Sequence, residues 1–170
     1  MRSALLYGAA AILVAMASPT SQAKDAKDGS SSVGFVIRDE AKASDLGVPI
    51  YPGAVPRRDK EDDRSGLTLA AWGGDNAFKI AVLKLTSEAP VDAIAGFYRD
   101  ALGRFGDVLD CSKEAPSPRS RDDVLTCEEK DTKQGSLIYK VGTPRHQHLV
   151  KIRERGSGVH IDIVRIDAGG

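Results

Sequence analysis

The two cysteines are the residues with the clearest chemistry. Cys111 and Cys127 are the only thiols of the 170-residue chain. No histidine is close in sequence to either, and the Cys-x-x-Cys spacing typical of redox sites is absent. An even number of thiols on predicted neighbouring strands of an exported chain indicates a structural disulfide. We expect a bond between them that closes a loop of about 15 residues and stabilises the fold by roughly 3 kcal/mol.

Histidines could supply nitrogen ligands to a metal ion. His146 and His148 share one face if their segment is a strand, because alternate side chains point the same way. His160 is expected opposite a residue near Glu154, roughly 20 Å from His148 at about 3.3 Å per residue. All three therefore cannot bind one ion. We expect surface histidines and no cofactor, with a site of His146, His148 and a carboxylate as the alternative.

Aromatic and basic side chains suggest two kinds of binding surface. Tyr51 lies in a proline-glycine turn and Trp72 precedes two glycines, so each either forms a ligand platform or plugs the end of a core. Basic residues occupy alternate positions of 151–155, either as an anion-binding row or as the solvated face of a half-buried sheet opposite Asp162. We favour the solvated face and keep Tyr51 and Trp72 as candidate ligand-binding residues.

Charge and missing motifs narrow the classes of function. Lys plus Arg number 24 and Asp plus Glu number 24, so the chain has no broad positive field for nucleic acid. The sequence contains no Gly-x-Ser-x-Gly elbow, no His-Glu-x-x-His pair and no EF-hand loop. Gly73 and Gly74 precede a strand rather than a helix, which argues against a phosphate cradle. Catalytic carboxylates converge only in space, so an enzyme stays an alternative.

The N-terminus has the pattern of a secretory signal. Residues 1–23 combine Arg2, an apolar run over 4–17, and the small residues Ser21 and Ala23. The run spans roughly 21 Å as a helix, whereas a bilayer core needs about 30 Å. We expect a periplasmic or extracellular mature chain without stable membrane insertion. Cleavage after Ala23 leaves 23 basic and 24 acidic residues, a net charge of −1.

The mature chain is expected to form a short leader and a single domain. Residues 24–32 contain no large apolar side chain and predict a flexible leader, followed by one domain over 33–170. Apolar residues at steps of three and four predict a helix over 90–105. Glycines between apolar runs predict two hairpins, over 67–85 and 149–166. Further strands are expected at 33–37, 108–111, 124–130 and 136–141.

These elements predict an α+β fold. One helix among roughly six strands, without βαβ repeats, favours a single antiparallel sheet of about five to seven strands with one main amphipathic helix packed on one face. Pro52 and Gly53 predict a type II turn. The charged segment 57–64 is expected to stand in water.

Part of the chain resembles a known group of proteins. Residues 45–54 (DLGVPIYPGA), a glycine-turned hairpin, and then residues 97–102 (FYRDAL) follow one another in this order. This order resembles a loosely defined family of uncharacterised exported bacterial proteins, in which a Pro-x-Tyr-Pro-Gly-Ala segment precedes a hairpin and a helix carrying Phe-Tyr-x-x-x-Leu. The resemblance covers about residues 45–105. It implies a small α+β domain in the bacterial envelope or outside the cell, and assigns no activity.

Together these features favour an exported, non-catalytic domain that binds a small ligand or an envelope protein. The contact surface is expected near Tyr51, Trp72 and the open face of the sheet. A small envelope hydrolase or metal-dependent enzyme using His146 and His148 is one alternative. A structural component of an envelope assembly is another. Nucleic acid is not an expected partner.

Overall fold

The computed structural model describes residues 33–61, 63–114, 124–129, 131 and 135–169. These residues belong to one compact unit. The predicted signal peptide (1–23) and leader (24–32) lie outside the described residues, as does most of the segment between the two cysteines.

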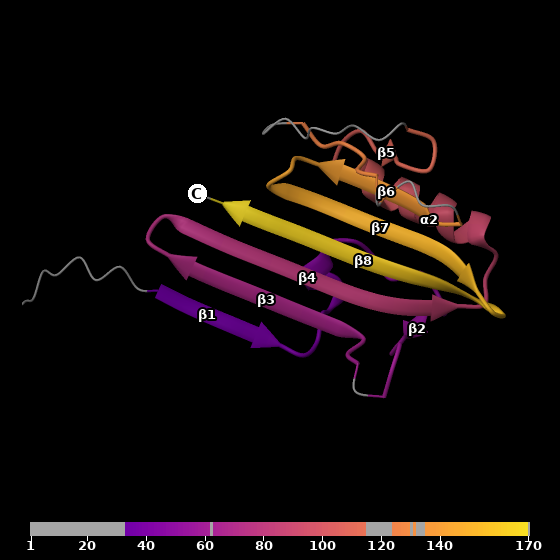
Figure 1. Cartoon of the computed structure of the whole chain (residues 1–170), viewed down its shortest axis with the longest axis horizontal. Coiled ribbons are helices and arrows are strands. Elements are labelled where there is room, and N and C mark those ends of the chain that lie inside the picture. Colours follow the sequence, from indigo (N-terminus) through magenta and orange to yellow (C-terminus); the bar gives the residue numbers. More distant parts are fainter. Residues whose placement is uncertain (1–32, 62, 115–123, 130, 132–134, 170) are drawn as a thin grey trace, which may run out of the picture. The chain divides into compact units, whose positions relative to one another are not determined.

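The described residues form one antiparallel sheet in the order β1-β3-β4-β8-β7-β6-β5, with β2 also paired to β4 (Figure 1). The strands are β1 (Val33–Arg38), β2 (Val55–Pro56), β3 (Gly66–Gly73), β4 (Asn76–Ser87), β5 (Leu109–Asp110), β6 (Leu137–Gly142), β7 (His146–Arg155) and β8 (Gly158–Gly169). The α+β class is therefore confirmed. The sheet is larger than the predicted five to seven strands, because the two-residue β2 adds an eighth strand beside β4.

Tight turns join the strands of the two long hairpins. Gly73 pairs with Asn76, and Arg155 pairs with Gly158, so only two residues connect the strands in each case. The first connecting residue is a glycine in both hairpins: Gly74 has φ of 57°, and Gly156 has φ of 63°. Glycine adopts this left-handed conformation without the steric cost of a Cβ atom. Both predicted hairpins are confirmed.

The helices cover one face of the sheet, which we call the helix face. Helix α2 (Val91–Gly103) follows Pro90, whose fixed φ suits a helix start, and buries Ile94, Tyr98 and Leu102. It contacts β6 and β7, and Figure 1 shows it behind these strands. Its buried side chains share one core with apolar residues from four strands: Leu83, Leu85, Tyr139, Val141, Val150, Ile152, Ile161 and Ile163.

A single helical turn, α1 (Ala43–Leu46), covers the rest of the helix face against β4 and β8. It buries Leu46 completely and ends at Gly47, which has φ of 72°. The predicted turn at Pro52 and Gly53 follows: the backbone N–H of Ala54 donates to the carbonyl of Tyr51 at 3.0 Å, and Gly53 has φ of 79°. These two short segments thus seal the core edge that α2 does not reach.

Two local predictions are wrong. The described residues of 124–130 contain no strand, only an isolated bridge at Val124. Side chains attach this segment to the sheet instead: the buried Lys140 ammonium donates to the carbonyl of Thr126 at 3.2 Å and forms an ion pair with Asp131.

The second wrong prediction concerns Arg57. Its side chain was expected in water but is only 7% exposed. Its guanidinium binds Asp162, so the long-range partner decides its burial.

Candidate binding surface

The predicted ligand-binding aromatics do not form a common platform. Tyr51 packs its ring edge-on against Phe97 at 5.2 Å, and its backbone N–H donates to the Tyr98 hydroxyl at 3.2 Å. Trp72 is 43% exposed, but its ring covers Gly34 on β1, where an added Cβ would clash with the ring. Tyr51 therefore belongs to the core, whereas Trp72 packs on the edge strand and also lines a surface hollow together with Phe35 and Phe78.

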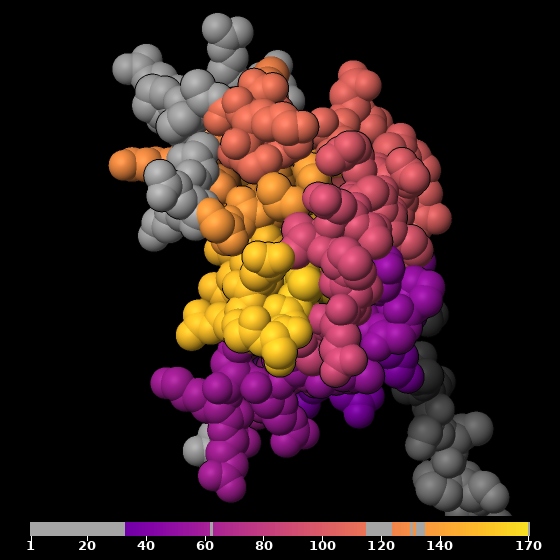
Figure 2. Space-filling model, turned by 90° about the vertical axis from the view of Figure 1, so that its right-hand side faces the viewer, coloured from indigo at the N-terminus to yellow at the C-terminus, as the bar shows by residue number. Residues whose placement is uncertain are grey.

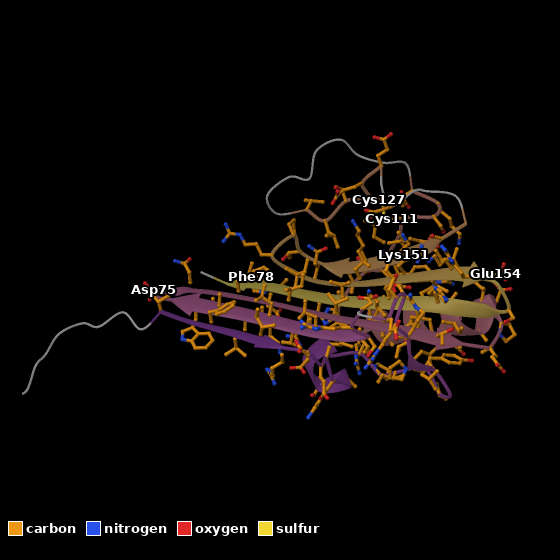
Figure 3. All side chains as sticks on the ribbon, turned by 60° about the horizontal axis from the view of Figure 1, so that its bottom comes forward. Asp75, Phe78, Cys111, Cys127, Lys151 and Glu154 are labelled. Carbon is orange, nitrogen blue, oxygen red and sulfur yellow. A yellow bond between two sulfur atoms is a disulfide. The ribbon has the colours of Figure 1, made fainter. Side chains whose placement is uncertain are left out.

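Cys111 and Cys127 form the predicted disulfide. Their Cα atoms are 5.3 Å apart, and both side chains are buried. They pack on Leu109, Ile138 and Leu149. Figure 3 shows the bridge on the side of the sheet that carries Phe78 and Lys151. The disulfide therefore covers one corner of the sheet face opposite to α1 and α2, on which the described residues place no helix and which we call the open face.

The histidines divide between the two faces of the sheet. Strand register places His146 and His148 on the helix face, whereas His160, opposite Arg153, lies on the open face. Within the described residues no three His, Cys, Asp or Glu side chains form a group that could hold a metal ion. His146 Nδ1 lies 3.6 Å from the Asp167 carboxylate.

His148 is a buried packing residue. It is 9% exposed, and its ring stacks on Phe105 with 4.1 Å between centroids. Burial and the nearby Arg165 guanidinium lower the pKa of His148 below its usual 6.5, although the Asp167 carboxylate partly opposes this. A neutral imidazole inside the helix face is thus part of the fold.

Cross-strand rows place apolar side chains together on the open face. The outer row crosses β1, β3, β4 and β8 and consists of Phe35, Ala71, Phe78 and Ala168. The next row consists of Ile37, Leu69, Ile80 and Ile166, and a third contains Leu67, Val82 and Val164. We define the apolar patch as Val33, Phe35, Ile37, Leu67, Leu69, Phe78, Ile80, Val82, Val164 and Ile166.

The apolar patch is accessible to water. Phe35 is 65% exposed, Ile37 52% and Phe78 38%, whereas Leu85 on the helix face is 1% exposed. A shallow hollow of about 550 Å³ lies by the two phenylalanines, lined also by the small Ala71 and Ala168. Arg145 is the only charged residue in the described part of this lining. The patch can therefore contact an apolar surface or ligand.

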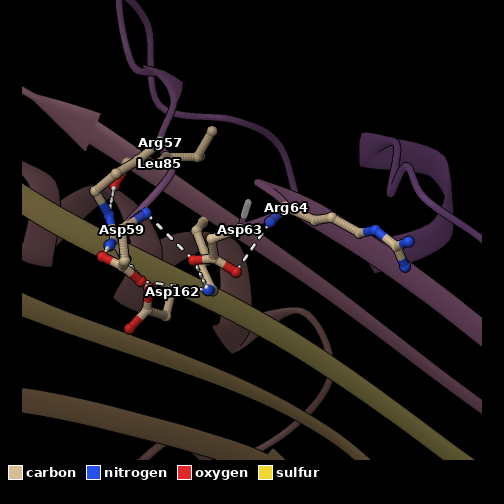
Figure 4. Close-up of polar contacts among 7 residues, drawn as sticks. Arg57, Asp59, Asp63, Arg64, Leu85 and Asp162 are labelled. Carbon is tan, nitrogen blue, oxygen red and sulfur yellow. Dashed lines mark hydrogen bonds and ion pairs between the residues drawn. The ribbon is translucent and has the colours of Figure 1, made fainter. Parts of the chain in front are cut away.

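The other half of the open face carries a network of ion pairs. Arg57 binds Asp162 at 2.5 Å, and Lys84 binds Asp63 at 2.6 Å and Asp59 at 3.2 Å (Figure 4). Arg57, Asp59 and Asp63 come from the charged segment 57–64, and Figure 2 shows this part of the chain, in purple, beside the yellow C-terminal strand. Ion pairing with Lys84 lowers the pKa of the Asp63 carboxyl. The charged segment therefore caps this half and leaves the apolar patch open.

The basic row of 151–155 lies beside this network. Register places Lys151 opposite Asp162, but the carboxylate of Asp162 binds Arg57. Lys151 and Arg153 are half-buried and Arg155 is exposed. Burial first, and then the Arg57 and Arg153 cations, lower the pKa of His160. The predicted counter-charge is thus engaged by a residue that the sequence did not pair with it.

The sequence contained a signal for the apolar patch. In β4, Phe78, Ile80 and Val82 alternate with Ala81, Leu83 and Leu85, so both faces of the strand are apolar. Such a pattern predicts burial on both sides, but α2 and α1 cover only one of them.

Comparisons with known proteins add no assignment. No family model matches the chain, and neither does any curated protein or solved structure. Among the described residues no helix is both long enough and apolar enough to cross a bilayer. The functional argument therefore depends on the surface itself.

Proposed function

We propose that this chain is an exported, non-catalytic domain that acts by binding a partner through the apolar patch. The observation that carries the proposal is the exposure of Phe35, Ile37 and Phe78 on the sheet face opposite to the described helices. Large contiguous apolar surfaces on soluble proteins are typical of interaction sites, because leaving them in water is unfavourable.

The surroundings of the hollow favour binding over catalysis. An active site brings several polar or titratable groups together around a substrate. In the described part of its lining the hollow instead combines aromatic and alanine side chains with the single charge of Arg145. Such a lining suits an apolar surface at the centre of an interface, with charge only at its rim.

Export is supported by the signal pattern of residues 1–23 and by the Cys111–Cys127 disulfide, since disulfides persist in oxidising compartments. The full chain with a C-terminal epitope tag, expressed in a bacterium and fractionated, should yield a periplasmic or secreted product beginning at Lys24. An uncleaved cytosolic product would contradict the proposal.

The binding function can be tested with the mature chain as bait. Envelope extract passed over immobilised residues 24–170 should leave a bound species, which mass spectrometry identifies. The Phe78→Lys variant should no longer capture it. Ile50→Lys is the matched control, because Ile50 is equally exposed at 38% but lies outside the apolar patch. Equal capture by the wild type and both variants would show that the patch is not the binding surface.

A further inference from the structure

We infer, on the basis of the proposed function, that the partner seated on the apolar patch is a second copy of this chain. In this arrangement the open faces of the two sheets pack against each other across a two-fold axis. A two-fold contact uses the same patch on both copies, so the patch has to be complementary to itself.

The chemistry of the patch meets this requirement. Its three rows across β1, β3, β4 and β8 contain no charged side chain, and Arg57 and Lys84 beside it are paired with Asp162, Asp59 and Asp63. A partner therefore has to offer a comparably apolar and uncharged surface. A second patch does so, whereas an acidic or basic partner would bury unpaired charge.

The shape of the patch is also self-complementary. In the outer row large and small residues alternate: Phe35 and Phe78 project, and Ala71 and Ala168 leave room by the hollow. When two sheets pack face to face, projecting side chains of one interdigitate with the gaps of the other. Phe35, 65% exposed beside the hollow, is placed to enter the hollow of the second copy.

The accessible area is sufficient for a stable dimer. Val33, Phe35, Ile37 and Phe78 are 81%, 65%, 52% and 38% exposed. At about 150–250 Å² for a large side chain, these four and the half-buried remainder of the patch expose roughly 700 Å² per copy. Two copies then bury roughly 1,400 Å², within the about 1,200–2,000 Å² of specific stable interfaces.

Long-range electrostatics do not oppose this contact. After cleavage at Ala23 the chain has 23 basic and 24 acidic residues, a net charge of −1. Two copies that are nearly neutral repel each other little at any ionic strength. The dimer should therefore persist over a wide range of salt concentration.

Two neighbouring residues of the edge strand allow a sharp test. Ile37 and Val36 are both exposed aliphatic residues of β1, at 52% and 36%, but they point to opposite faces of the sheet. Sedimentation equilibrium of residues 24–170 should give twice the chain mass. Ile37→Lys should raise the dissociation constant roughly 100-fold or more, because it places a charge in the apolar contact. Val36→Lys should leave the dimer intact.

The other outcomes overturn the inference in distinguishable ways. Equal dissociation by both variants, with circular dichroism showing that both are folded, would indicate pairing through the edge of β1 rather than through the face. A wild-type chain that stays monomeric at all concentrations refutes the dimer. If Ile37→Lys then abolishes capture from envelope extract and Val36→Lys does not, the proposed function stands with a different partner. If capture is also unaffected, both are wrong.

Discussion

His148 is a buried group through which mild acid acts on the fold. Burial and Arg165 hold its pKa below the value of about 6.5 that it has in the unfolded chain. Between these two pKa values the unfolded chain binds more protons, so stability is lost as pH falls. The pKa of Asp45 is lowered by its contact with Lys79, and this carboxyl titrates only in stronger acid.

The urea midpoint should therefore decrease when the pH is lowered from 7.5 to 5.5. The urea midpoint of His148→Gln should decrease less over the same pH range. The variant lacks the imidazole that takes up a proton in the unfolded chain but resists protonation when it is buried. The pKa of His160 is lowered too, so part of the dependence should remain. An unchanged pH dependence in His148→Gln would contradict the assignment.

Lys140 and Asp131 form a buried pair whose members depend on each other. Their side chains are 4% and 5% exposed. Lys140→Met should lower the free energy of unfolding by about 3 kcal/mol, because it leaves the Asp131 carboxylate buried without its cation. The double variant Lys140→Met, Asp131→Asn should recover part of this loss. Its residue 131 is uncharged, and the side-chain amide oxygen can still accept the hydrogen bond that the Glu128 N–H donates to Asp131 at 2.8 Å. Urea titration of the three proteins measures both effects, and equal stability of single and double variants would contradict them.

At the scale of elements, Trp72 holds the edge strand. Its ring covers Gly34, so β1 is fixed by an aromatic contact in addition to its backbone pairing with β3. Trp72→Ala should speed hydrogen exchange at the amides of β1 by about tenfold, while the amides of β8 in the centre of the sheet keep their protection. Phe105→Ala, which removes another exposed aromatic, is the control and should leave β1 unchanged.

Elements set by local chemistry could be predicted from the sequence. Both long hairpins depend on glycines at positive φ between strands, and α2 follows from its apolar spacing after Pro90. The disulfide followed from parity and compartment. Features set by distant partners could not be predicted: the buried guanidinium of Arg57 binds Asp162, 105 residues away, in addition to the nearby Asp59, and β2 forms by pairing with β4.

The candidate surface shows the same limit. Both faces of β4 carry apolar side chains, but the helices of the described residues cover only the face of Leu83 and Leu85. Trp72 and Tyr51 are typical ligand-platform residues by type and position. Phe97 packs against the ring of Tyr51, and one side of the Trp72 ring lies on Gly34 while the side chain stays 43% exposed beside the hollow. Neither contact can be read from local sequence.

At the scale of the whole molecule, self-association couples stability to concentration. A dimer that forms only between folded chains adds binding free energy to the folded state, so its thermal midpoint rises with protein concentration. The mature chain should therefore show a midpoint that increases by several degrees over a hundredfold range, about what 2–3 kcal/mol produces in a domain of this size. Calorimetry or circular dichroism at matched scan rates measures this shift.

Ile37→Lys should make the midpoint independent of concentration, with a value close to that of the wild type at its lowest concentration. Ile37 is half-exposed within a single chain, so its replacement costs the monomer little. Val36→Lys should retain the wild-type dependence. A wild-type midpoint that does not move with concentration would mean that the open face stays in water when the chain folds, and that its apolar rows serve a partner of another kind.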